Sequence, residues 1–161
     1  MSANTSLALV RSPLAKETGR ETEIVQWPAY DSPDASRRDH FVRRDGCEYA
    51  GTHLIVDFWD ARGLDDLARM EHALREAVEA GGATLLHIHL HHFTPNGGIS
   101  GVAVLAESHI SVHTWPERDF AAFDVFMCGD ANPKEAVAAL QRAFQPARVE
   151  VHAHRRGAVG R

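Results

Sequence analysis

The chain has 161 residues, of which 44% are hydrophobic and 24% are charged, and its formal net charge is −5. This length and composition fit one globular domain with a hydrophobic core, and the negative charge argues against a nucleic acid as the main partner. Two cysteines form no disulfide framework, and no apolar run is long enough for a secretory signal or a membrane span. We therefore expect a cytoplasmic protein.

Regular patterns begin near residue 49, after a first segment of different character. Residues 1–48 are rich in Ser, Arg, Asp, Glu and Pro without a sustained period, which predicts a flexible N-terminal extension. The segment 51–58 predicts a strand, and a helix follows it. The helix is expected to have Asp65 and Asp66 in its first turn and a Gly-Gly pair at its end. Its apolar residues recur at helical spacing: Leu64, Leu67, Met70, Leu74 and Val78.

Most of the remaining chain alternates as strands do. Strands are expected at 84–93, at 99–105, within 106–117, at 120–128 and at 147–154, and residues 157–161 form a C-terminal tail. A second helix precedes the last strand, with Asn132 as its cap, Pro133 first, Glu135 in a capping-box-like pair, and Val137, Leu140 and Phe144 buried. Short connections between the middle strands favour antiparallel pairing. We therefore expect an α+β fold, a two-layer sandwich of a mainly antiparallel sheet with its helices packed on one face.

Eleven histidines are the unusual feature of the composition. Several alternate along expected strands, namely His87, His89 and His91 on one strand and His152 and His154 on the last. Histidines at alternate strand positions can bind zinc, but no carboxylate or cysteine completes an obvious ligand set. We therefore expect no metal site and interpret these positions as a polar strand face, in solvent or at a subunit interface.

The stretch 106–117, AESHISVHTWPE, also alternates, with Ile110, Val112 and Thr114 facing one way and His109, Ser111 and His113 the other. A solvated hydroxyl is the simplest interpretation of Ser108, and no G-x-S-x-G motif supports a serine hydrolase. A third hypothesis is that Ser108 attacks the carbonyl carbon of its own preceding peptide bond, so that the chain cuts itself and leaves a pyruvoyl group. His113 and Ser100 are the local candidates for proton transfer in that reaction.

Two longer motifs make the third hypothesis specific. GISGVAVLAESHISVHTWPE (98–117) and FAAFDVFMCGD (120–130) resemble the prokaryotic S-adenosylmethionine decarboxylase proenzyme family, whose members make their own pyruvoyl cofactor. The resemblance covers residues 49–156, which it implies form a pyruvoyl-dependent decarboxylase domain. It implies cleavage between Glu107 and Ser108. The β chain would then end at Glu107, and the α chain would begin with a pyruvoyl group made from Ser108.

The resemblance also implies roles for further residues. His113 matches a histidine that transfers a proton during processing, Ser100 matches a serine that assists processing, and Cys128 matches the proton donor of the decarboxylation. The substrate's amine would form a Schiff base with the pyruvoyl ketone, which withdraws the electrons released as CO₂ leaves. Three further residues match substrate-binding positions: Phe93, Trp115 and Glu117. The rings could stack on adenine, and the carboxylate could accept hydrogen bonds from ribose.

Each of these residues also has an ordinary interpretation when it is taken alone. Cys128 would be a small buried residue, Phe93 and Trp115 core aromatics, and Glu117 a solvated turn carboxylate. The sequence departs from the family pattern in FTPNGGIS, which is one residue longer than the usual Phe-x-Pro-x-Gly-x-Ser spacing. In addition, His92 stands where lysine is frequent.

The leading hypothesis is a pyruvoyl-dependent S-adenosylmethionine decarboxylase, which would supply the aminopropyl donor for spermidine synthesis. One alternative decarboxylates ornithine or arginine on the same scaffold. A further alternative is an unprocessed, histidine-rich metal-binding or regulatory homologue. The resemblance also implies a homodimer of processed αβ protomers that acts on a small molecule, with neither a nucleic acid nor a membrane as partner.

Overall fold

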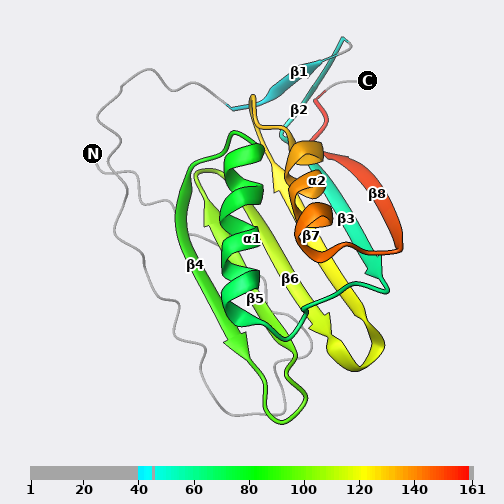
Figure 1. Cartoon of the computed structure of the whole chain (residues 1–161). Helices are drawn as coiled ribbons and strands as arrows, with labels where there is room; N and C mark the ends of the chain where they lie inside the picture. Colours follow the sequence, from blue (N-terminus) through cyan, green and yellow to red (C-terminus); the bar gives the residue numbers. More distant parts are fainter. Residues whose placement is uncertain (1–39, 45, 160–161) are drawn as a thin grey trace, which may run out of the picture. The chain divides into compact units, whose positions relative to one another are not determined.

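A six-stranded antiparallel sheet organises the fold (Figure 1). The computed structural model describes residues 40–44 and 46–159. In spatial order the strands are β4 (Leu85–His92), β5 (Ile99–Leu105), β6 (Ser108–Trp115), β7 (Phe120–Met127), β3 (Gly51–Trp59) and β8 (Arg148–Arg156). Every neighbouring pair is antiparallel. The four consecutive strands β4 to β7 thus return the chain to β3, which lies between β7 and β8.

Both helices cover the same face of the sheet (Figure 1). α1 (Leu67–Ala80) begins after Asp66, whose side chain accepts a hydrogen bond from a backbone N–H of the first turn. The two acidic residues that were expected inside this turn therefore precede the helix. α2 (Pro133–Phe144) begins after Asn132, which caps it in the same way, as predicted. In the part of the chain that the structure describes, no helix is long and apolar enough to cross a membrane.

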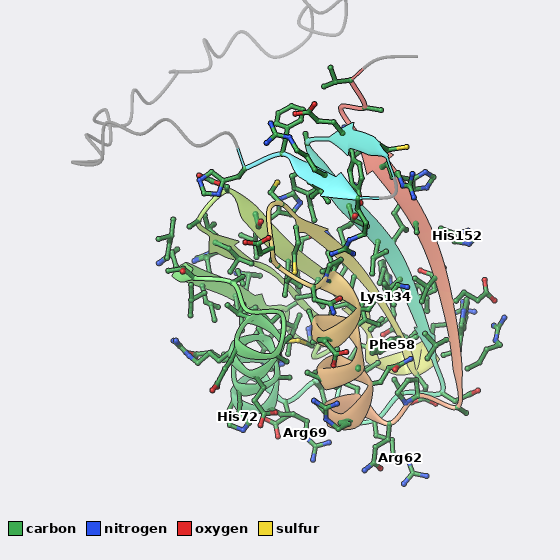
Figure 2. All side chains as sticks on the ribbon, turned by 90° about the horizontal axis from the view of Figure 1, so that it is seen from above. Phe58, Arg62, Arg69, His72, Lys134 and His152 are labelled. Carbon is green, nitrogen blue, oxygen red and sulfur yellow. The ribbon has the colours of Figure 1, made fainter. Side chains whose placement is uncertain are left out.

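The sheet has a covered face and an open face. Alternate strand residues on the covered face pack against the helices, and five of them that are at most 1% exposed are Val56, Phe58, Ile110, Val112 and Phe123. Figure 2 shows Phe58 between α2 and the sheet, and His152 on the other side of β8. The intervening residues of β6, including His113, lie on the open face, as the alternation predicted. The predicted two-layer α+β sandwich is confirmed.

One strand departs from the expected alternation. The register between β4 and β5 shifts between Leu85 and His87, which marks a β-bulge. The bulge turns Leu86 outward, and this side chain is 63% exposed. The prediction that Leu86 shares the inner side with Ile88 and Leu90 was therefore wrong for Leu86, whereas the other two pack against the core.

A short hairpin precedes the sheet, formed by β1 (Val42–Arg44) and β2 (Cys47–Tyr49). It lies in the segment for which the sequence predicted a flexible extension, and most of that segment, residues 1–39 and 45, is outside the described residues. The sequence pattern misses this hairpin because its strands have three residues each, which is too short for an alternation to be visible.

Candidate active site

A two-residue turn joins β5 to β6 and contains the peptide bond that the sequence predicted to be cleaved. Leu105 pairs with Ser108, so Ala106 and Glu107 form the turn. Glu107 has a φ of 65°, a left-handed conformation that costs a residue with a Cβ about 1–2 kcal/mol. The favoured two-residue hairpin turns have a positive φ at their first central residue, whereas here only the second has one. The bond before Ser108 therefore follows a strained residue.

The Ser108 hydroxyl is held from the end of the neighbouring strand. Ser108 is only 9% exposed, and the backbone N–H of Cys128 donates a hydrogen bond to its Oγ at 3.2 Å. Gly129 follows with a φ of 59°, a value that a glycine adopts without strain, so the chain can turn away directly after Cys128. The Cys-Gly-Asp motif thus places Cys128 against the residue predicted to be processed.

The Cys128 thiol favours its protonated form. Burial raises the pKa of this thiol most, the hydrogen bond with Ser108 acts in the opposite direction, and the negative charge of Glu107 raises the pKa further. A thiol with a raised pKa keeps its proton at neutral pH. This arrangement suits a proton donor better than a nucleophile.

His40 also contacts the turn, although no sequence motif marks it. Its Nδ1 lies 2.9 Å from Glu107 Oε2, and its carbonyl oxygen accepts a hydrogen bond from Gly129 N–H at 2.8 Å. Both side chains of this contact are about half exposed, so the contact itself adds little stability. Sequence reasoning could not find His40, because the contact depends on a short charged segment that lies far from Glu107 in the sequence.

A second group of predicted residues gathers at the other end of β6. Ser100 and His113 are register partners, and Ser100 Oγ lies 2.8 Å from His113 Nδ1. Both residues line a cavity of about 350 Å³. The three predicted substrate-binding residues, Phe93, Trp115 and Glu117, line the same cavity. Its volume lies in the range of small-molecule sites.

The two groups are separated along β6. Ser108 and His113 are five residues apart, which corresponds to about 16 Å in an extended strand. Because five is an odd number, the two side chains also point to opposite faces of the sheet, Ser108 to the covered face and His113 to the open face. We call Glu107, Ser108 and Cys128 the turn group, and Phe93, Ser100, His113, Trp115 and Glu117 the cavity group. Within one chain, the cavity group does not reach the Glu107–Ser108 bond.

The open face is rich in histidine. His53 Nε2 lies 3.3 Å from Asp124 Oδ1, and its ring meets the His109 ring at an edge, with the ring centres 6.2 Å apart. Burial lowers the pKa of His109, the charge of His53 lowers it further, and Asp124 acts in the opposite direction. Among the described residues, no three histidine, cysteine or carboxylate side chains are placed to hold a metal ion. The metal-binding alternative gains no support from this arrangement.

Comparisons with known proteins identify the family of the chain. The S-adenosylmethionine decarboxylase family profile matches residues 52–157. The chain is 44% identical to the S-adenosylmethionine decarboxylase proenzyme of Thermomicrobium roseum over 110 residues, 68% of this chain and 95% of that protein. It is 44% identical to the proenzyme of Methanococcus aeolicus over 115 residues, 70% of this chain and 97% of that protein. The crystal structure of the adenosylmethionine decarboxylase from Aquifex aeolicus VF5 matches with a TM-score of 0.63 at 32% identity, covering 70% of this chain and 94% of that one.

The fold and these comparisons together define the class of protein as a decarboxylase. The chain belongs to the S-adenosylmethionine decarboxylase family, as the 52–157 match shows. The resemblance inferred from the two sequence motifs is thereby confirmed. The matched segment begins after β2, so the hairpin β1–β2 precedes the family domain.

Proposed function

We propose that this chain is a precursor that converts its own Ser108 into a pyruvoyl group and then decarboxylates S-adenosylmethionine. The observation that carries the proposal is the left-handed Glu107 directly before Ser108, because it strains the backbone at the bond that processing must break. Family membership supports the decarboxylation, and the relatives are named proenzymes. The decarboxylated product would be the aminopropyl donor for spermidine synthesis.

The turn group fits the chemistry of self-processing. Ser108 Oγ attacks the carbonyl carbon of Glu107, so that an ester replaces the peptide bond. Elimination then releases the Glu107 carboxylate and leaves dehydroalanine at position 108. Water adds, ammonia leaves, and a new chain begins with the pyruvoyl group. The hydrogen bond from Cys128 N–H orients Ser108 Oγ before the attack.

The same residues then divide the work of decarboxylation. When present, the pyruvoyl group supplies a carbonyl that withdraws electrons from the carbon losing CO₂. Cys128 holds a proton at Sγ beside position 108, and its raised pKa keeps that proton available at neutral pH. Phe93 and Trp115 offer aromatic faces to adenine and to the sulfonium cation, and Glu117 accepts hydrogen bonds from the ribose hydroxyls.

A homodimer completes the site in this proposal. The turn group and the cavity group of one chain are about 16 Å apart, so a second copy brings its His113 and Ser100 to the Glu107–Ser108 bond. A two-fold axis lets each turn group meet the partner's cavity group in the same way. The open sheet face fits this role, because Ile55 and Val104, each 40% exposed, are apolar side chains that no described helix covers.

Mass and turnover measured on one preparation test the proposal. We expect the intact mass of the purified protein to show two fragments split after residue 107, and the second fragment to start without an amine. We expect CO₂ release from carboxyl-labelled S-adenosylmethionine and none from ornithine or arginine. A single uncut species that is fully active would overturn the processing proposal, and release from ornithine or arginine alone would overturn the substrate.

Neither alternative hypothesis is favoured by a specific observation. The matched family and the two relatives carry the name of S-adenosylmethionine decarboxylase, not that of an ornithine or arginine decarboxylase. A regulatory homologue that is never processed would have no use for a strained Glu107 or for a thiol held beside Ser108. The cytoplasmic location stays a prediction from the sequence.

A further inference from the structure

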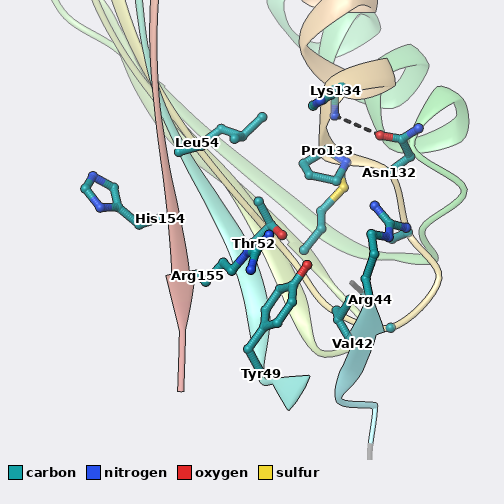
Figure 3. Close-up of a pocket in the computed structure, with 14 residues that line it drawn as sticks. Val42, Arg44, Tyr49, Thr52, Leu54, Asn132, Pro133, Lys134, His154 and Arg155 are labelled. Carbon is teal, nitrogen blue, oxygen red and sulfur yellow. Dashed lines mark hydrogen bonds between the residues drawn. The ribbon is translucent and has the colours of Figure 1, made fainter. Parts of the chain in front are cut away.

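A second cavity, which no residue of the turn group or the cavity group lines, lies between the hairpin β1–β2, strands β3 and β8, and the first turn of α2 (Figure 3). Its volume is about 430 Å³, within the range of small-molecule sites. Val42, Arg44 and Tyr49 line it and precede residue 52, where the family match begins. The cavity thus depends on a part of this chain outside the matched segment, and the proposed decarboxylation does not use it.

The lining of this cavity is positively charged. Arg44, Lys134 and Arg155 contribute three cations, and none of the described residues that line the cavity carries a carboxylate. In the described part of the chain, the side chains of Arg44 and Lys134 form no ion pair. Because the whole chain has a net charge of −5, this concentration of positive charge is a local feature that attracts an anion.

Tyr49 adds a hydrogen-bond donor at the centre of the cavity. The residue is only 3% exposed, and Figure 3 shows its hydroxyl directed into the cavity between β3 and α2. This hydroxyl makes no hydrogen bond with any described residue. The Arg155 guanidinium lies over the Tyr49 ring, 5.3 Å from its centre, which places a cation beside this hydroxyl-bearing ring. A hydroxyl that has no partner in the described chain and is directed into a cavity can donate a hydrogen bond to an acceptor on a ligand.

The first turn of α2 and the cavity wall supply the remaining features. Asn132 caps the helix by accepting a hydrogen bond from the Lys134 N–H. The N-terminus of α2, which carries the partial positive charge of the helix dipole, therefore lies at the cavity and attracts an anion. The wall is partly apolar, because Val42, Leu54, Met127 and Pro133 line the cavity together with the charged residues. The cavity therefore combines an anion-binding end with an apolar surface.

We propose that this cavity binds a small organic phosphate, with the phosphate between Arg44, Lys134 and the Tyr49 hydroxyl and an apolar group against Leu54 and Met127. Arginine, lysine and a helix N-terminus are the groups that proteins use for phosphate. Met127 and Gly129, which both line the cavity, flank Cys128 in the sequence.

Titration calorimetry on the purified full-length protein tests the proposal with three probes at neutral pH and low salt. They are phenyl phosphate, inorganic phosphate and phenol. We expect saturable binding of phenyl phosphate, binding of inorganic phosphate about tenfold weaker because the apolar part of the wall stays uncovered, and none of phenol. Added salt should weaken both phosphates.

Three variants locate the binding site. Lys134→Met, Arg44→Met and Tyr49→Phe should each weaken phenyl phosphate about five- to tenfold, because each removes one charge or one hydrogen bond. Arg142→Met, which removes a cation from the last turn of the same helix, should leave binding unchanged. Arg44 and Lys134 are exposed, so their substitution leaves the core intact. The proposal is overturned if phenyl phosphate does not saturate the protein, or if the Arg142 variant weakens binding as much as the other three.

Discussion

The two ends of β6 carry the two parts of the proposed site, and they are built differently. At the first end Ser108 is buried, follows a left-handed Glu107 and accepts a hydrogen bond from Cys128 N–H. At the second end His113 and Trp115 stand on the open face beside a cavity. In the proposed function, the first end breaks a bond of its own chain, and the second end meets the partner subunit.

This difference shows that neighbouring residues in a motif need not share a site. Glu-Ser-His and His-Thr-Trp-Pro-Glu lie within eleven residues, 107–117, of the sequence. Ser108 and His113 are separated along an extended strand, and the pleat of the strand turns their side chains to opposite faces of the sheet. In the proposed dimer, one short motif would therefore contribute to two different sites.

The largest expected effect comes from breaking the first end of β6. Ser108→Ala removes the attacking hydroxyl, so we expect one uncut chain of 161 residues and no decarboxylase activity above background. Intact mass and CO₂ release measure both outcomes. Ser111→Ala is the matched control on the same strand, because Ser111 only donates a hydrogen bond to Asp124 on the open face. Normal cutting of the Ser108→Ala chain would refute the role of the hydroxyl.

The next effect tests whether the two ends of β6 work in different chains. Cys128→Ala and His113→Ala should each lower turnover by at least about 100-fold when made alone, the effect typical of a lost proton-transfer group. In a mixed dimer of the two variants, one of the two sites combines an intact Cys128 with the partner's intact His113, so the dimer should have about half of the wild-type activity. Because about half of the randomly formed dimers are mixed, the mixture should recover about a quarter of the wild-type activity.

Coexpression of the two variants with different affinity tags allows the mixed dimer to be isolated and assayed. The matched control mixes each variant with itself. If the tandem-purified mixed dimer is as inactive as its parents, the turn group and the cavity group do not meet across a dimer interface.

A smaller effect concerns substrate binding at the second end. Trp115→Ala should raise KM for S-adenosylmethionine about 10- to 100-fold, because aromatic stacking on a base contributes roughly 1–3 kcal/mol. Trp115→Phe keeps an aromatic face and should raise KM much less. Steady-state kinetics separate KM from kcat. An equal rise in KM for both variants would argue against stacking.

The smallest effect is on the pH dependence of stability. The pKa of His109 in the folded chain is lowered below the ordinary value of 6.5, chiefly by burial and by His53, while Asp124 acts in the opposite direction. The stability that this histidine contributes is therefore present above pH 6.5 and is lost as the pH falls through the lower pKa of the folded state. His109→Gln should reduce the fall in Tm between about pH 8 and about pH 5, by about 2 °C or less.

Thermal unfolding followed by circular dichroism measures this change. His152→Gln is the matched control, because His152 is exposed on the edge strand β8. An unchanged pH profile in the His109 variant would mean that its burial has no consequence for stability.

Much of the fold could be predicted because strand alternation and helix caps are local signals. The buried positions of β6 and the Asn132 cap are examples. The bulge that exposes Leu86 could not be predicted, because a register shift depends on the partner strand β5. The hairpin β1–β2 gave no periodic signal, since each strand has only three residues.

The residues of the candidate site could be predicted from the sequence. Their separation into the turn group and the cavity group was not predicted. The signal for the division was present, because the odd spacing between Ser108 and His113 places them on opposite faces of a strand. The His40–Glu107 contact carried no such signal. It joins residues 67 positions apart, and only the folded chain shows that they meet.

The strand order also determines how the two fragments would be held together after the proposed cut before Ser108. Strands β3, β4 and β5 then belong to one fragment, and β6, β7 and β8 to the other. Since β3 is hydrogen-bonded on both sides to strands of the other fragment, and β5 pairs with β6, the fragments interdigitate across three ladders. Cleavage therefore leaves a heterodimer held by a shared core, whose thermal stability should depend on protein concentration.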